Sequence, residues 1–281
     1  MQRVFYHVTR GLIGIANNEN FSITKKIILY TDYFKLIALA IQATISPQLT
    51  NYSIDKKFRI NSFGLTVYYP NIYAFFFLFN EIFCNSEYPA LFNMKTYIDL
   101  GANIGISLLW YHLFNPNMTA YAFEPDEINY RFLKKNIKEN CIENCFLFKK
   151  AISNNINKVK FYRILDNIQN LDSGLKLNQK LPHEVFQVKT AKLSTLIKKI
   201  KHISLVKMDI EGGEYLVFDD LKKTNTLIKI ERIIFESHVF TAMEKRSLAK
   251  ILSWIGHLGK THSHATSKYT SSHYWQNNEL F

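Results

Sequence analysis

The sequence predicts an α/β fold in which a mostly parallel central sheet carries helices on both faces. Five short apolar segments alternate with segments of helical periodicity between residues 97 and 255. One of them, Tyr97–Leu100, runs through two glycines directly into a helix-like segment. Four of the five end on an acid. Parallel strands joined by helices end at one edge of a sheet, where ligands of such folds bind, so we expect these acids to share one rim.

The segment before this pattern predicts a helical extension. Residues 21–45 have apolar side chains at helical spacing, and Pro47 follows the expected end of the helix. Two short strands, 57–60 and 65–69, then flank a glycine-containing turn and predict a hairpin, and 72–84 predicts a buried helix. We therefore divide the chain into an N-terminal helical extension, 1–55, and a second domain, 56–281, whose motifs lie between about 95 and 238.

The second domain is predicted to contain the elements of the central sheet and some additions. The expected sheet strands are 97–100, 118–123, 145–148, 203–210 and 232–236, with helices from about 106, 128, 211 and 248. Residues 159–162 indicate an added strand. The polar loop 165–183 is long enough to favour a binding loop or lid, and the tail is expected to form a hairpin or irregular structure.

The composition is that of a folded protein with a basic surface. Hydrophobic residues make up 47% of the chain, and the formal net charge is +12. The Lys and Arg residues are scattered, which favours a solvated surface over a nucleic-acid site. The odd count of three cysteines argues against a disulfide scaffold or a cysteine-rich zinc site, and we expect no signal peptide or membrane-spanning helix and a cytoplasmic location. The 21–45 helix is expected to pack against the fold, with peripheral membrane contact as the alternative.

The glycine-containing turn predicts a nucleotide-type cofactor. Gly101 and Gly105 are four positions apart, with Asn103 between them, which differs from the Gly-x-Gly-x-x-Gly pattern of dinucleotide sites. Glu124 follows Gly105 by 19 residues, at the end of the second strand, where a carboxylate can accept hydrogen bonds from both ribose hydroxyls. An acid and free loop amides also suit a cofactor with an amino-acid tail. The pattern therefore favours S-adenosylmethionine.

These motifs resemble the FkbM family of S-adenosylmethionine-dependent methyltransferases, which has a class I Rossmann-like fold. The resemblance rests on Ile98–Gly105, Ala122–Pro125, Ala151–Ser153 and Val206–Glu214. It implies that methionine is held by Asp99, Gly101, Asn103 and Gly105, ribose by Glu124 and adenine by Ala151 and Ile152, with Asp209 facing the transferred methyl. One departure is Leu193-Ser194, where the family usually has Leu-Asp.

The resemblance implies O-methylation of a hydroxyl on a sugar, a glycan or a glycosylated metabolite. Such a reaction needs alignment and a base, and we expect Asp209 or His238 to be the base, with Glu211 and Glu236 shaping the site. We expect no metal site, although the same carboxylates with His238 offer the ligands of a divalent ion. The alternatives are an RNA-binding protein or RNA methyltransferase, and a Rossmann module without catalytic activity. We expect no stable nucleic-acid partner.

Overall fold

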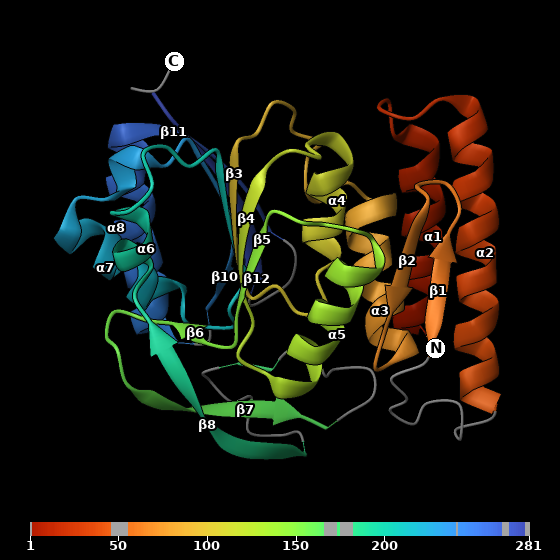
Figure 1. Ribbon diagram of the computed structural model, residues 1–281, viewed down its shortest axis with the longest axis horizontal. Coiled ribbons are helices and arrows are strands. Elements are labelled where there is room, and N and C mark those ends of the chain that lie inside the picture. Colours follow the sequence, from red (N-terminus) through yellow and green to blue (C-terminus); the bar gives the residue numbers. More distant parts are fainter. Residues whose placement is uncertain are drawn as a thin grey trace.

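The central sheet confirms the α/β prediction. The computed structural model describes residues 2–45, 56–165, 173–174, 182–239, 241–265 and 270–278. Its main sheet has seven strands in the order β11-β12-β10-β9-β3-β4-β5 (Figure 1). The pairs from β10 to β5 are parallel, and β12 is antiparallel to both of its neighbours. This arrangement is the class I Rossmann-like fold that the resemblance implies.

The five expected strands all form, and the tail adds two more. In chain order the strands are β3 (Thr96–Leu100), β4 (Thr119–Phe123), β5 (Cys145–Phe148), β9 (Leu205–Met208), β10 (Arg232–His238), β11 (Gly259–Ala265) and β12 (Thr270–Asn277). The tail is thus the expected hairpin, and it extends the sheet beside β10. His273 of β12 is buried, and its two ring nitrogens form hydrogen bonds with the hydroxyl groups of Ser237 and Ser263.

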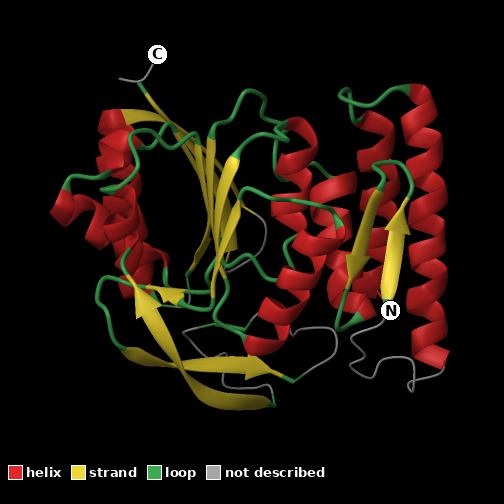
Figure 2. Cartoon of the chain, viewed as in Figure 1, coloured by secondary structure: helices red, strands yellow, loops and turns green. Residues whose placement is uncertain are grey.

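Helices cover both faces of this sheet (Figure 2). One face carries α4 (Ile106–Phe114) and α5 (Glu127–Glu139), and the other carries α6 (Leu193–Ile197), α7 (Glu214–Thr224), the 3₁₀ turn Leu227–Lys229 and α8 (Ala242–Leu258). Local capping explains where two of them begin. Asp126 accepts hydrogen bonds from the first amides of α5, and Thr241 forms a capping box with Glu244 at α8.

The N-terminal elements form a further layer outside α4 and α5 (Figure 1). They are α1 (Gln2–Asn17), α2 (Ile23–Ile45), the antiparallel pair β1 (Lys57–Ile60) and β2 (Leu65–Tyr68), α3 (Ile72–Phe79) and the π-helical turn η2 (Asn80–Cys84). The sequence analysis did not predict α1. One apolar cluster runs from Tyr33 of α2 through Phe79 and Phe83 to Trp110 of α4. The expected domain boundary at residue 55 lies outside the described residues and stays a prediction.

A second, three-stranded sheet lies across one end of the main sheet (Figure 1). Its strands are β6 (Ala151–Ile152), β7 (Lys158–Ile164) and β8 (His183–Ala191), in the order β6-β8-β7. The added strand expected at 159–162 is part of β7, the expected turn at Ala151 is the short strand β6, and β8 was not predicted. Most of the 165–183 loop lies outside the described residues.

Candidate active site

The glycine loop, residues 101–105, is held tightly between β4 and β9. The amides of Gly101 and Ala102 both donate to Phe123 O, at 3.0 Å each. Gly101 has φ +79°, and a Cβ there would lie 1.9 Å from the carbonyl oxygen of Asp209. Gly105, at φ +89°, is the residue from which α4 starts, and Asn103 also has a positive φ of 50°. These left-handed conformations explain the glycines and bring the loop into contact with the end of β9.

Glu124 lies where β4 ends and joins the glycine loop to the next helix. One carboxylate oxygen accepts the Asn103 N–H and the other accepts the Asp126 N–H, both at 2.8 Å. The side chain is only 5% exposed, and burial raises the pKa of Glu124 to about 8. Each oxygen keeps a second lone pair. The two acceptor oxygens of Glu124 and their position at the end of β4 therefore fit the two hydroxyls of a ribose, as the sequence pattern predicts.

Asp99 lies beneath the loop and does not line its surface. Its carboxylate is fully buried, accepts a 2.5 Å hydrogen bond from Ser107 Oγ and is 3.4 Å from Lys207 Nζ. Lys207 also donates to Gly101 O at 2.7 Å. In this structure Asp99 supports the loop through Ser107 and Lys207, and the methionine contact that the resemblance implies for it stays a prediction.

The sequence analysis missed Lys207, although a signal was present. It is the one charged side chain in the apolar run Ile203–Met208. Burial lowers the pKa of Lys207, but the charges of Asp99 and Asp209 raise it by a larger amount, so the net shift is upward. The ammonium therefore stays charged and ties Asp99 to the glycine loop.

His238, at the end of β10, lies between two carboxylates. Its Nε2 is 2.9 Å from Glu211 Oε2, and its Nδ1 is 3.1 Å from Glu214 Oε1. Glu214 is itself fixed by the amides of Ile210 and Gly212. Burial lowers the pKa of His238, but the two carboxylates raise it well above its usual range. The ring is therefore an imidazolium at neutral pH.

The remaining carboxylates of the site are Asp209 and Glu236, at the ends of β9 and β10. Burial raises the pKa of Glu236 to about 8, and the charge of Asp209 adds to this effect. Asp209 Oδ1 is buried and has no hydrogen-bond partner among the described residues. The rim thus combines a carboxyl group that titrates near neutrality with an acceptor atom available to a ligand.

The same rim offers one set of metal-type ligands. One ligand atom from each of Asp209, Glu211 and His238 lies within 4.8 Å of the others. In this structure, however, the Glu211 and His238 atoms are paired with each other. Glu211 also has a positive φ of 51°, followed by Gly212 at 93°, so a tight turn positions its carboxylate. The expectation of no metal site stays a prediction.

Loop 165–183 reaches this turn through its described residues. Gly174 pairs with Tyr162, and a Cβ at Gly174 would lie 2.3 Å from Glu211 Cβ.

On the cofactor side, Ile152 of β6 is buried in the same apolar cluster as Phe123, which precedes Glu124. Ala151 is also buried. Of the two residues that the resemblance assigns to adenine, Ile152 therefore packs next to the strand that ends at Glu124, whereas Ala151 packs with Phe161 and Val188.

The N-terminal layer also contributes to the site, which the sequence did not indicate. Burial raises the pKa of Glu81 in η2, and Glu87, Glu236 and Asp209 raise it further. The pKa of Tyr88 is raised by burial and then by Asp209 and Glu236. The charges of the carboxylate rim therefore act on both side chains. The available signal was Glu81 itself, the only charged residue in the apolar segment 72–84.

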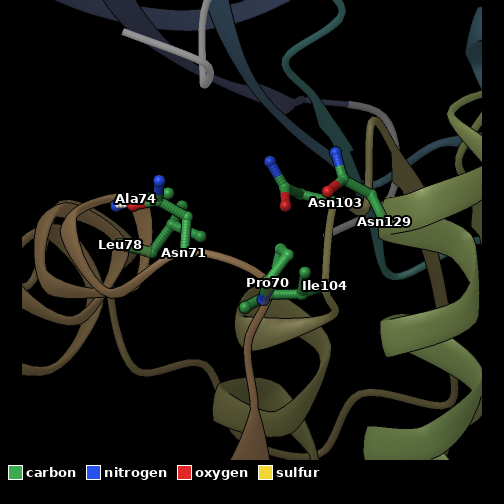
Figure 3. Close-up of a pocket in the computed structure, with 7 residues that line it drawn as sticks. All are labelled: Pro70, Asn71, Ala74, Leu78, Asn103, Ile104 and Asn129. Carbon is green, nitrogen blue, oxygen red and sulfur yellow. Dashed lines mark hydrogen bonds between the residues drawn. The ribbon is translucent and has the colours of Figure 1, made fainter. Parts of the chain in front are cut away.

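A small pocket lies between the N-terminal layer and the glycine loop. Figure 3 shows the loop residues Asn103 and Ile104 and Asn129 of α5, together with residues of α3 and of the segment just before it. The latter are Pro70, Asn71, Ala74 and Leu78. Asn71 Oδ1 accepts hydrogen bonds from the Tyr73 and Ala74 amides and so fixes this wall. The N-terminal layer therefore borders the glycine loop directly.

Comparison with known families agrees with this geometry. The model of the methyltransferase FkbM domain matches residues 99–262, more than half of the chain, and includes the glycine loop, Glu124 and the carboxylate rim. The chain belongs to the FkbM methyltransferase domain family. In this FkbM domain the family's usual acid before β9 is replaced by Ser194, whose amide and hydroxyl bind the buried Asp220 carboxylate at 3.0 and 2.9 Å.

Individual relatives of the FkbM domain are distant. A curated relative, the 31-O-demethyl-FK506 methyltransferase FkbM of Streptomyces tacrolimicus, is 36% identical over 77 residues, or 26% of this chain and 30% of the relative. The chain thus covers about a third of that relative's length. An FkbM methyltransferase from Methylobacillus flagellatus KT has a TM-score of 0.46 and 17% identity, over 68% of this chain and 46% of that one. A putative methyltransferase from Streptococcus mutans in complex with SAH has a TM-score of 0.42 and 11% identity, over 66% and 91%. At these TM-scores the fold assignment rests on the strand order.

Proposed function

We propose that this FkbM domain is an S-adenosylmethionine-dependent methyltransferase that methylates a hydroxyl of a sugar, a glycan or a glycosylated metabolite. The observation that supports it best is the contact between the cofactor loop and the carboxylate rim. The Gly101 backbone touches the Asp209 carbonyl, so a cofactor on the loop lies beside Asp209, Glu236 and His238. Family membership supports the same cofactor.

The residues present fit this cofactor. Glu124 would accept the ribose hydroxyls, and the backbone polar groups of the glycine loop that its internal hydrogen bonds do not use would face the methionine moiety. The unpartnered Asp209 Oδ1 would face its positive groups. The bound sulfonium supplies an electrophilic methyl group. The work left to the protein is to orient the acceptor hydroxyl in line with that methyl and to remove its proton.

The base is better assigned to Glu236 or Asp209 than to His238. An imidazolium paired on both nitrogens has no lone pair with which to accept a proton. His238 instead holds Glu211 and Glu214 in place and is a positioning residue. Glu236 has a pKa of about 8, close to the value at which a general base is most effective near neutral pH.

The chemistry of the rim and one relative support a hydroxyl acceptor. Carboxylates accept hydrogen bonds, so a rim containing Asp209, Glu236 and Glu81 suits a molecule with several hydroxyls. The Streptomyces tacrolimicus relative carries an O-methyltransferase name. We extend this reaction type to the present chain and take the acceptor to be a saccharide.

The test is transfer of a labelled methyl group. The protein is incubated with methyl-labelled S-adenosylmethionine and, separately, with a cell glycan extract, purified oligosaccharides and total RNA. We expect label in the saccharide fractions. Label in RNA alone would contradict the proposed acceptor, and no cofactor binding in calorimetry would contradict the enzyme proposal and favour a module without catalytic activity.

The same assay tests the base. Glu236→Gln is expected to lower kcat by roughly a hundredfold or more with little change in cofactor affinity, because general bases contribute factors of about 10² to 10⁴. Wild-type kcat should rise with pH through about 8, as Glu236 loses its proton. Glu143→Gln, at an exposed position, is the matched control. Equal kcat for the two variants would exclude Glu236 as the base.

A further inference from the structure

The outward side of α2 is an exposed apolar surface that the site does not use. The apolar residues on it are 36–79% exposed, and they are Ile23, Ile27, Ile28, Phe34, Leu39, Ile41 and Ile45. We call these seven residues the α2 face. They extend along a helix of 23 residues, about 35 Å long. Figure 1 shows α2 as the outermost element on its side of the molecule.

The α2 face is not the side of the helix that holds the fold together. The opposite side carries Leu29, Tyr33, Leu36 and Ala43, all buried in the apolar cluster of the N-terminal layer. A surface helix of this kind normally presents charged and polar residues to solvent. On the α2 face Lys35 is the single exposed charge among Ile, Phe and Leu side chains. Five of the seven apolar residues recur at helical spacing as one stripe, and the exposed Thr24, Thr31, Lys35 and Gln42 separate that stripe from Ile28 and Leu39. An exposed apolar stripe along the whole helix indicates a binding surface.

Charge indicates which partner this surface fits. The only acid in α1 and α2 is Asp32, which is buried and accepts hydrogen bonds from Asn61 and Ser62. Of the three lysines of α2, Lys35 is exposed on this side, whereas Lys26 Nζ donates to Ala16 O and Lys25 Nζ lies over the Phe21 and Phe63 rings. Residues 1–60 contain eight Lys and Arg residues and three Asp and Glu residues. A second copy would bring the same positive charge to the interface, whereas an anionic lipid surface complements both its charge and its apolar residues.

The contacts of α2 favour lying on a membrane over crossing it. Among the described residues, α2 alone is long and apolar enough to span a bilayer by length and composition, with a third of its apolar window buried in the fold. Crossing would pull Asp32 away from Asn61 and Ser62 and expose it to hydrocarbon. It would also break the hydrogen bond between Tyr33 and Asn80, which lies in the layer that borders the glycine loop.

We propose that the α2 face docks this protein, in the plane of the interface, onto an anionic lipid bilayer. In this arrangement Ile and Phe side chains enter the acyl boundary and the exposed Lys35 meets lipid phosphates. Docking leaves the inner side of α2 packed as it is. The proposal does not depend on methyl transfer, because it concerns the opposite side of the N-terminal layer from the glycine loop.

The test is sedimentation of the full chain with vesicles, without cofactor or acceptor. Vesicles of phosphatidylcholine alone are compared with vesicles that also contain about 30% phosphatidylglycerol, an anionic lipid that makes the vesicle surface negative. The variant Ile27→Glu/Ile41→Glu places two charges on the α2 face. The control, Ile156→Glu/Ile228→Glu, makes the same change at exposed isoleucines outside the N-terminal layer. Circular dichroism confirms that each variant is folded.

We expect wild type and control to sediment with the anionic vesicles and to bind neutral vesicles more weakly. The α2 variant should bind at least about tenfold more weakly, since burying one isoleucine side chain alone is worth about a factor of ten. Failure of wild type to bind, equal binding to neutral vesicles, or equal binding of the α2 variant and the control would each overturn the proposal. A vesicle-free dimer that the α2 variant dissociates would overturn it in favour of a second copy.

Discussion

Replacing Glu124 by Gln tests the cofactor site with a change of very few atoms. In the free protein both carboxylate oxygens accept backbone N–H groups, one from Asn103 and one from Asp126. A glutamine amide has one oxygen, so its NH₂ group must face one of these two donors. Either the Asn103 or the Asp126 amide then loses its hydrogen bond, and the ribose loses one of its two acceptors.

The size of the effect follows from these contacts. Leaving one buried ribose hydroxyl without its acceptor costs about 1–3 kcal/mol, which raises the Kd for S-adenosylmethionine by roughly 5- to 150-fold. The stability change is expected to be smaller, because the protonated form of Glu124 already resembles glutamine and burial raises its pKa to about 8. Affinity should therefore fall by much more than thermal stability.

Calorimetric titration with the cofactor, together with a thermal melt, checks this expectation. Glu127→Gln is the matched control, because Glu127 is three residues further on and, within the described part of the chain, forms exposed ion pairs with Arg131 and Lys149. If Glu124→Gln melts like wild type and binds the cofactor with unchanged Kd, Glu124 does not hold the ribose. If it fails to fold, Glu124→Asp keeps both acceptor oxygens and takes its place in the titration.

Three further changes test the support of the site and the fold. Gly101→Ala should destabilise the protein by at least about 3 kcal/mol and abolish cofactor binding, since a Cβ at φ +79° would lie 1.9 Å from Asp209 O; a melt and a Kd near wild type would contradict this contact. Lys207→Met should cost about 3–5 kcal/mol in denaturant unfolding, because it leaves the fully buried Asp99 without its cation, and a smaller loss in the double variant with Asp99→Asn would confirm the coupling. Burial lowers the pKa of His273 to about 4, so the unfolded chain takes up a proton at this position before the folded protein does as the pH falls. The free energy of unfolding should therefore decline between about pH 6.5 and 4, and His273→Gln should flatten that decline.

Local sequence patterns were sufficient for the elements that carry the motifs. The strand, glycine turn and helix at 97–111 and the acid after the second strand each follow from residues close in sequence. Gly101 and Gly105 have positive φ, the conformation for which glycine is the usual residue. Helix α1 was missed although Val8, Leu12 and Ile15 recur at helical spacing, and strand β8 was missed because the adjacent Val185 and Phe186 interrupt the alternation expected of a strand.

The roles of individual acids depended on contacts between distant residues. Asp99 follows the family pattern, but Ser107 and Lys207 enclose it, which no local pattern indicates. His238 is a plausible base in the sequence and an imidazolium in the structure, because Glu211 and Glu214 reach its two nitrogens. A pKa depends on desolvation and on neighbouring charges, and both are properties of the packed fold.

By itself the sequence determined the fold class, the cofactor loop and the rim of acids, because spacing along a strand or a turn is a local property that the backbone converts directly into position. Only the tertiary structure decided what each acid does and what the N-terminal layer contributes. Glu81 approaches the rim, and α2 presents one apolar side to the core and another to solvent. Both results come from the packing of that layer on α4 and α5, and packing across such sequence distances is set by the shape and burial of many side chains together.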